Sequence, residues 1–269
     1  HNHGYFLCRN VVNGKKENRK LALLDCGRHH FSTLVFLQRI YIYKFSIFRI
    51  YIYCHFWLLR MEKELKQDPI NLVKVVLFGP ESTGKTTLSK QLARHYNTVW
   101  TPEFAREYLQ KKWNNERKTC EISDLVPIAI GQMRLENKLA KRADKLLICD
   151  TDLLETKVYS EEYYGGFVDE KLNKASEENQ YDLYLLTYVD TPWEEDDLRD
   201  RPGRRLEMFT AFENALKKNQ KNYILLKGDK ETRLKVATAA IDEIIRQKEY
   251  LFSFSESLTA KEQKVAVKK

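Results

Sequence analysis

The chain has 269 residues and a hydrophobic fraction of 43 %, which is enough for one α/β domain of ordinary size with additional segments. Its formal net charge of +8 arises within residues 1–60, which hold 10 Lys and Arg against 2 Asp and Glu, whereas residues 61–269 hold 36 of each. The neutral body argues against a nucleic-acid partner, and its single histidine, His95, argues against a histidine-based zinc site or a serine–histidine triad.

Residues 1–60 are not typical of a folded domain. The hexapeptides RIYIYK at 39–44 and RIYIYC at 49–54 are near-copies, and alternating Ile and Tyr is what an AT repeat encodes on translation. The first methionine of the chain is Met61. We therefore predict that residues 1–60 are not part of the folded domain and represent translated upstream sequence. Peptides from this range in the native protein would contradict that interpretation.

A membrane contact through residues 31–59 is the alternative for this range. Arg39, Lys44 and Arg49 divide the stretch into charge-free runs shorter than the ~20 residues that a spanning helix needs. Stable membrane insertion is therefore not expected, although the basic and aromatic composition suits an interfacial anchor. A signal peptide is not predicted, because no short apolar region ends in a small-residue cleavage site.

From Met61 onward, apolar runs alternate with amphipathic stretches, which is the pattern of a parallel sheet flanked by helices. We expect strands at 73–78, about 97–100, 145–149, 183–189 and 222–226. We expect helices at 85–95, 103–112, 122–142, 153–163, 206–219 and 231–248. The predicted fold class is α/β, a three-layer P-loop NTPase fold with a five-stranded parallel sheet. It occupies residues 61–255, and the Lys-rich residues 256–269 are expected to form a frayed polar tail.

A phosphate-binding motif follows the first predicted strand. Residues 79–86 match G-x-x-x-x-G-K-[ST] at every position. Gly79 and Gly84 let backbone N–H groups turn toward phosphate oxygens, and the start of the following helix adds positive potential. Lys85 is expected to reach the outer phosphates, and the Thr86 hydroxyl is expected to bind Mg²⁺. The predicted nucleotide-binding residues are Gly79, Pro80, Glu81, Ser82, Thr83, Gly84, Lys85, Thr86 and Thr87.

Carboxylates follow the second and third predicted strands. Glu103 follows the second strand, and Asp150 and Asp152 follow the third. Ligands of open α/β sheets bind beyond the carboxyl ends of the strands, where a carboxylate can hold Mg²⁺ or accept a proton from an attacking hydroxyl. The structural alternatives are a first-turn acid favoured by the helix dipole for Glu103 and a helix N-cap for Asp152.

Arginines are concentrated in DDLRDRPGRR at residues 196–205. Arg199, Arg201 and Arg204 fit the R-x-R-x-x-R spacing of nucleoside-kinase lids. A mobile arginine lid can neutralise the charge of a transferring phosphoryl group and exclude water from it. Arg201 and Arg204 are therefore catalytic candidates. The alternative is a solvated, charge-balanced start of a helix.

Taken together, these stretches resemble the ribosylnicotinamide kinase domain of the NadR family. The resemblance covers about residues 72–246 and rests on VVLFGPESTGKTTL, TPEFAREYL, IAIGQ, ICDTDLLETKVYSEEYYG and WEEDDLRDRPGRR. It implies that ATP phosphorylates the 5′-hydroxyl of nicotinamide riboside to give nicotinamide mononucleotide for NAD salvage. It also implies that Glu103, Arg106 and Asp150 line the riboside site. Gln132 is a weaker candidate there, with a helix-surface amide as the alternative.

The bifunctional members of that family carry an N-terminal adenylyltransferase domain with paired histidines in its phosphate-binding motif. Nothing before residue 61 resembles that domain, so we expect this chain to stop at the mononucleotide.

The sequence thus predicts a small-molecule kinase that uses ATP and Mg²⁺. The predicted catalytic residues are Lys85, Glu103, Asp150, Arg201 and Arg204, the substrate-binding residues are Glu103, Arg106, Gln132, Asp150 and Asp152, and the metal ligands are Thr86 and Asp150. A kinase of another nucleoside or nucleotide and a nucleotide-binding regulatory ATPase or GTPase remain as alternatives. Cys120 and Cys149 form no CxxC pair, which indicates a reducing, cytoplasmic compartment. The sequence leaves the oligomeric state open.

Overall fold

The structure, a computed structural model, describes residues 48–53, 55–56, 60–198 and 202–266. The chain divides into two compact units, His1–Leu59 and Arg60–Lys269. The described residues of the first unit are helical, and Phe48, Tyr51 and Phe56 among them are exposed. Most of residues 1–60 lie outside the described residues, and their exclusion from the folded domain stays a prediction. Across the described part of the chain, no helix combines the length and the apolar character needed to cross a membrane.

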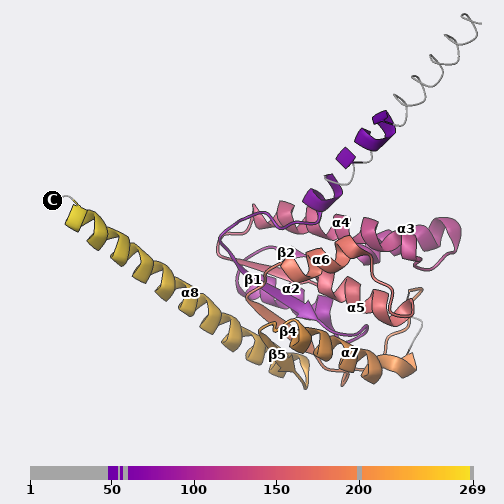
Figure 1. Ribbon diagram of the computed structural model, residues 1–269. Helices are drawn as coiled ribbons and strands as arrows, with labels where there is room; N and C mark the ends of the chain where they lie inside the picture. Colours follow the sequence, from indigo (N-terminus) through magenta and orange to yellow (C-terminus); the bar gives the residue numbers. More distant parts are fainter. Residues whose placement is uncertain (1–47, 54, 57–59, 199–201, 267–269) are drawn as a thin grey trace, which may run out of the picture. The chain divides into compact units, whose positions relative to one another are not determined.

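Five parallel strands form one sheet in the second unit, in the order β2-β3-β1-β4-β5 (Figure 1). The strands are β1 Val73–Phe78, β2 Trp100–Thr101, β3 Leu146–Asp150, β4 Leu183–Thr187 and β5 Tyr223–Leu226. The central strand β1 pairs with β3 so that Leu77 lies opposite Asp150. The residues that follow β1 therefore meet the end of β3 at one edge of the sheet. The predicted fold class is confirmed.

Helices cover both faces of this sheet. They are α2 Lys85–His95, α3 Phe104–Glu116, α4 Ile122–Ala140, α5 Leu153–Tyr163, α6 Glu170–Glu178, α7 Arg205–Lys218 and α8 Lys230–Ala266, with a short 3₁₀ helix η1 at Pro202–Arg204. The predicted helices at 85–95 and 153–163 have the observed bounds of α2 and α5.

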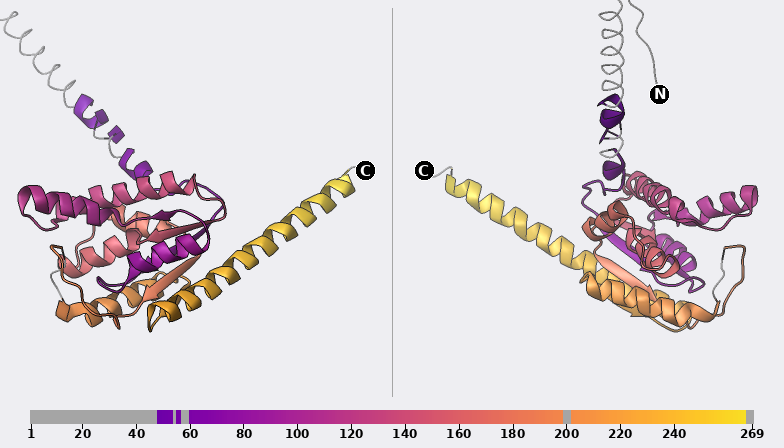
Figure 2. Two further views of the ribbon diagram at one scale, coloured as in Figure 1. Left: turned by 180° about the vertical axis from the view of Figure 1, so that it is seen from behind. Right: turned by 45° about the vertical axis from the view of Figure 1, so that its right-hand side comes forward.

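Alternate residues of β1 face two separate cores, because successive side chains of a strand point to opposite faces. Val76 and Phe78 pack with side chains of α5 and α7, whereas Val75 and Leu77 pack with side chains of α2 and α8. Figure 2 shows α2 and α8 side by side on their face of the sheet. All six residues of β1 are buried, as expected for a parallel strand covered on both faces.

Three elements differ from the sequence-based expectations. Strand β2 is limited to Trp100–Thr101, because Asn97 has a φ of 48° and turns the chain before it becomes extended. Helix α6 was not predicted, since it is short and polar and buries only a narrow face. Its start is fixed by the Asp169 side chain, which accepts hydrogen bonds from the backbone N–H groups of Lys171 and Leu172. Helix α8 continues past residue 248 to Ala266, so most of the expected frayed tail is helical.

Candidate functional site

The predicted phosphate-binding loop lies between β1 and α2. Gly79 has a φ of 135°, and a Cβ atom there would lie 2.8 Å from Thr187 Oγ1 and 2.9 Å from the Thr187 carbonyl oxygen. Only glycine allows this close approach to β4 without a shift of the backbone. Gly84 has a φ of 84° and forms the left-handed N-cap of α2, with open space where its Cβ would be.

Threonine and serine side chains fix the shape of the loop. Thr83 Oγ1 donates to the Pro80 carbonyl oxygen at 2.8 Å and lies 2.7 Å from Thr187 Oγ1. Ser82 has a φ of 54°, and its hydroxyl accepts a hydrogen bond from the Glu194 backbone N–H at 2.9 Å. The loop is thus bonded both to the sheet and to the segment that follows β4. Thr86 and Thr87, at the start of α2, are exposed.

The Lys85 ammonium group lies inside this loop rather than in solvent. It donates to the carbonyl oxygens of Gly79 at 2.5 Å and Pro80 at 3.0 Å, and it lies 3.1 Å from Glu155 Oε1. Burial alone would lower the pKa of Lys85, but the carboxylates of Glu155, Glu103 and Asp150 raise it above its ordinary value. Lys85 therefore stays protonated and is surrounded by acids from three elements.

Asp150 lies at the end of β3, directly beside the loop. Its Oδ2 accepts a hydrogen bond from Thr86 Oγ1 at 2.6 Å, and its Oδ1 is buried with no hydrogen-bond partner among the described residues. Burial, together with the negative charge of Glu103, raises the pKa of Asp150 to about 6. Within the described part of the chain, no group of three or more His, Cys, Asp or Glu side chains could hold a metal ion.

Oxygen donors of Thr86 and Asp150 nevertheless fit Mg²⁺. This ion prefers oxygen ligands and usually takes only one or two protein carboxylates, because phosphate oxygens and water complete its shell. The unpartnered Asp150 Oδ1 and the adjacent Thr86 hydroxyl supply such a donor pair.

Glu103 and Gln132 belong to one arrangement at the start of α3. Glu103 is the half-buried N-cap residue of that helix, and its side chain makes no capping hydrogen bond. Gln132 is only 2 % exposed, so the helix-surface alternative is wrong. Its Oε1 accepts a hydrogen bond from the Phe104 backbone N–H at 2.8 Å, and its Nε2 donates to the Pro102 carbonyl oxygen at 3.4 Å. Gln132 thus holds both residues that flank Glu103.

Asp152 has the structural role that the sequence left open. It is the N-cap of α5, where Oδ1 accepts from the Glu155 backbone N–H at 3.0 Å. Its Oδ2 accepts from the Tyr184 hydroxyl at 2.8 Å, and the side chain is buried. Burial raises the pKa of Asp152 to about 6. Because both carboxylate oxygens already have protein partners, the structure favours the N-cap over the predicted contact with a substrate.

The predicted arginines lie in different surroundings. Arg199 and Arg201 fall outside the described residues. Arg204 forms ion pairs with Glu207 and, at 3.6 Å, with Glu162. Arg106 is exposed on α3 and forms an ion pair with Asp196. The described start of the arginine-rich segment is therefore bonded to α3.

Three residues near the loop were missed by the sequence analysis. Glu155 is 2 % exposed and contacts Lys85, although its position in a helix gives no local sign of burial. Arg205 Nη2 donates to the Ser82 carbonyl oxygen at 2.9 Å. Arg233 is 4 % exposed, and its guanidinium reaches a carbonyl of the loop at Thr83 at 2.6 Å and pairs with Asp190. Arg205 lies in the arginine-rich segment at 196–205 without being singled out there, and no pattern in the sequence distinguishes Arg233 from a surface residue.

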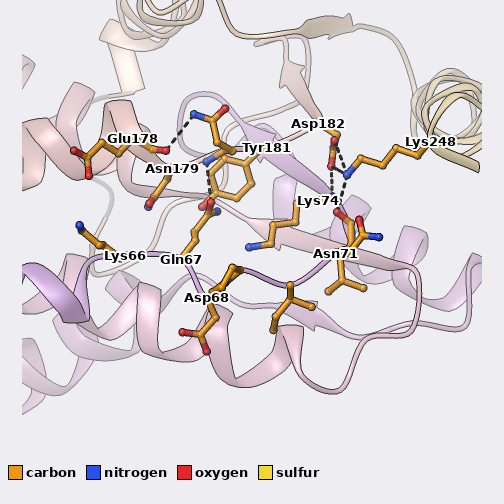
Figure 3. A pocket seen from close by; sticks show the side chains of 14 residues that line it. Lys66, Gln67, Asp68, Asn71, Lys74, Glu178, Asn179, Tyr181, Asp182 and Lys248 are labelled. Atoms are coloured by element: carbon orange, nitrogen blue, oxygen red, sulfur yellow. Dashed lines mark hydrogen bonds and ion pairs between the residues drawn. The ribbon is translucent and has the colours of Figure 1, made fainter. Parts of the chain in front are cut away.

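A cavity of about 630 Å³ lies at the opposite edge of the sheet, where β1 and β4 begin (Figure 3). Lys74, Asp182 and Lys248 line it, and the Lys248 Nζ lies 2.8 Å from an Asp182 carboxylate oxygen. The buried Lys74 ammonium pairs with Glu136 Oε1 at 3.1 Å. This cavity is separate from the phosphate-binding loop, which follows the other end of β1.

Known proteins match the part of the chain that contains the phosphate-binding loop and the sheet. The family described as an AAA domain matches residues 74–233. The chain is 31 % identical over 151 residues to the trifunctional NAD biosynthesis/regulator protein NadR of Salmonella typhimurium (strain LT2), a match that covers 55 % of this chain and 35 % of that protein. The chain thus spans about a third of the length of that curated relative. The predicted resemblance to NadR is confirmed.

Solved structures of NadR show the same fold. A NadR protein in complex with NR superposes with a TM-score of 0.55 at 22 % identity, covering 65 % of this chain and 52 % of that chain. A NadR protein in complex with NAD and AMP-PNP superposes with a TM-score of 0.54 at 22 % identity, covering 65 % and 50 %.

Proposed function

Since the chain belongs to the AAA domain family, we propose that it is a small-molecule kinase that uses ATP and Mg²⁺ to phosphorylate the 5′-hydroxyl of nicotinamide riboside. The observation that carries this proposal is the meeting of Lys85, Asp150 and Glu103 at one edge of the sheet. Burial opposes the charge of Lys85, whereas Glu155 and then Glu103 and Asp150 raise its pKa, so all three carboxylates act on the same ammonium group. A phosphate cradle and a proton acceptor are thereby adjacent, as phosphoryl transfer to a hydroxyl requires.

Lys85 and the backbone N–H groups of the loop bind the outer phosphates of the nucleotide in this mechanism. Thr86 and Asp150 would hold Mg²⁺, which supplies positive charge to the phosphate oxygens when it is bound. Since Asp150 is engaged by Thr86 at 2.6 Å, Glu103 is the better candidate for the base. Its side chain makes no capping hydrogen bond to α3.

Glu103 accepts the proton of the 5′-hydroxyl as that oxygen forms a bond to the γ-phosphorus. The bond between the γ-phosphorus and the β–γ bridging oxygen breaks, and ADP leaves with that oxygen. Arg106 and Gln132 position the acceptor side, the first by direct contact and the second by holding the chain around Glu103. Arg201 and Arg204 neutralise the charge of the transferring group.

The relatives support the choice of substrate class. One NadR structure contains NR, and another contains the ATP analogue AMP-PNP. The neutral charge of residues 61–269 fits a small-molecule acceptor better than a nucleic acid.

Release of ADP by the full chain tests this proposal. The protein is incubated with ATP and Mg²⁺ and with nicotinamide riboside, with the common nucleosides, or with no acceptor. We expect ADP only with nicotinamide riboside. ADP formed only with another nucleoside would identify that nucleoside as the acceptor. Equal ADP release with and without acceptors would indicate a nucleotide-hydrolysing regulator. Glu103→Gln should lower turnover by about 10²-fold, and near-normal turnover would assign the base to Asp150.

A further inference from the structure

The hydrogen-bond donors of the Lys85 ammonium group are all used by the phosphate-binding loop and Glu155. A lysine ammonium has three N–H donors. Lys85 directs them to three acceptors, namely the carbonyl oxygens of Gly79 and Pro80 and the carboxylate of Glu155. A phosphate oxygen can therefore bind Lys85 only if one of these acceptors is given up. The two carbonyls belong to the loop itself, which leaves Glu155 as the partner that can be exchanged.

The backbone around Glu155 is rigid, whereas its carboxylate is incompletely bonded. Its backbone N–H donates to Asp152 Oδ1 at 3.0 Å in the first turn of α5. Its Oε2 is buried and has no hydrogen-bond partner among the described residues. The charged and titratable groups that act on it are Lys85 of α2, Glu103 before α3 and Asp150 of β3, and on its own helix it acts on Tyr159. Lys85 is the one attractive group in this set.

We propose that Glu155 holds Lys85 within the loop and releases it to the outer phosphates of the nucleotide. Glu155 is then a positioning residue that sets nucleotide affinity by competing with phosphate for one ammonium group. This inference rests on the proposed function, because it takes the loop to be a nucleotide site. It adds a buried acid to the residues that the loop motif predicts.

Competition by Glu155 depends on its ionisation. Burial raises the pKa of the Glu155 carboxyl to about 8, although Lys85 opposes the shift. The competing negative charge is therefore small well below pH 8 and full well above it. An ionised carboxylate also repels incoming phosphates, since two like charges interact strongly in a poorly solvated site. Nucleotide affinity should consequently fall as the pH rises through this range.

Equilibrium binding of ADP to the full chain, with a chelator present, tests the inference without needing an acceptor or a metal. Well above the pKa of Glu155, Glu155→Gln should bind ADP about tenfold more tightly than the wild type, and well below it the two should agree within about twofold. The wild type by itself should also bind ADP more weakly as the pH rises, so part of the test does not depend on the stability of the variant.

Glu136→Gln is the matched control. Glu136 is also fully buried and also lies 3.1 Å from a lysine ammonium, that of Lys74, but at the opposite edge of the sheet. It should follow the wild type at every pH. Unchanged or weaker binding by Glu155→Gln at high pH would overturn the inference, as would a wild-type affinity that does not fall with pH. Absence of ADP binding by the wild type at every pH would instead refute the proposed function, and this inference with it.

Discussion

Gly79 offers a direct test of how the phosphate-binding loop is built. An alanine at this position would have to adopt a φ of 135°, a backbone conformation that residues with a side chain rarely adopt. Its Cβ would also lie 2.9 Å from the Thr187 carbonyl oxygen. That oxygen belongs to the backbone of β4 and cannot rotate away. The strained backbone costs about 1–3 kcal/mol, and the forced shift of packed strands costs about 1–3 kcal/mol more. We expect Gly79→Ala to lower the free energy of unfolding by about 4 kcal/mol.

Gly84→Ala is the control for backbone conformation alone. Gly84 has a φ of 84°, but no atom lies within 4 Å of the Cβ position. Its replacement should cost only about 1–2 kcal/mol, the penalty of a left-handed residue. Urea unfolding followed by circular dichroism measures both losses, with equal denaturant slopes as the check that they can be compared. Equal losses in the two variants would show that the approach to Thr187 is not what requires glycine at position 79.

Three further predictions concern stability. Arg233→Ala should lower the free energy of unfolding by about 1–3 kcal/mol, because the buried Thr83 carbonyl oxygen loses its donor and Asp190 loses its ion-pair partner. Arg233→Lys should recover part of this loss in the same urea assay. Gln132→Ala should cost about 1–3 kcal/mol because the Phe104 N–H loses its acceptor, and an unchanged urea midpoint would contradict this role. Folding raises the pKa of Asp150 from 3.8 to about 6 and that of Glu155 from 4.5 to about 8. Both groups therefore contribute stability that is complete below these unfolded values and is lost as the pH rises, up to about pH 6 for Asp150 and about pH 8 for Glu155. Urea midpoints across that range should fall in the wild type and fall less in Glu155→Gln.

Local patterns were sufficient for the sheet and for the phosphate-binding loop. The loop motif, the strand before it and the helix after it are contiguous, so one window of sequence contains all the constraints. Asp150 could be predicted for a related reason, since an acid that ends an apolar strand has few structural explanations. Asp150 lies next to Thr86 because β1 pairs with β3.

Contacts between distant segments could not be predicted in this way. Glu155 and Arg233 resemble ordinary helix-surface residues until the helices pack, and only then do they face the loop. Gln132 was predicted only as a weaker substrate-binding candidate, and its 2 % exposure and its bond to the Phe104 N–H depend on how α4 packs against α3. Side chains whose roles depend on tertiary packing leave no periodic signal in the chain.

The contacts of Arg205 have a consequence for how this protein could vary. Arg205 Nη1 donates to the Thr191 carbonyl oxygen at 2.9 Å while Nη2 of the same guanidinium donates to the Ser82 carbonyl oxygen. The chain therefore leaves the phosphate-binding loop at Thr191 and returns to the same point at Arg205. The described residues between these two positions are thus tied to the loop, and Glu194 among them donates its backbone N–H to the Ser82 hydroxyl. A change of length or sequence that keeps Thr191, Glu194 and Arg205 would leave their three hydrogen bonds to Ser82 in place.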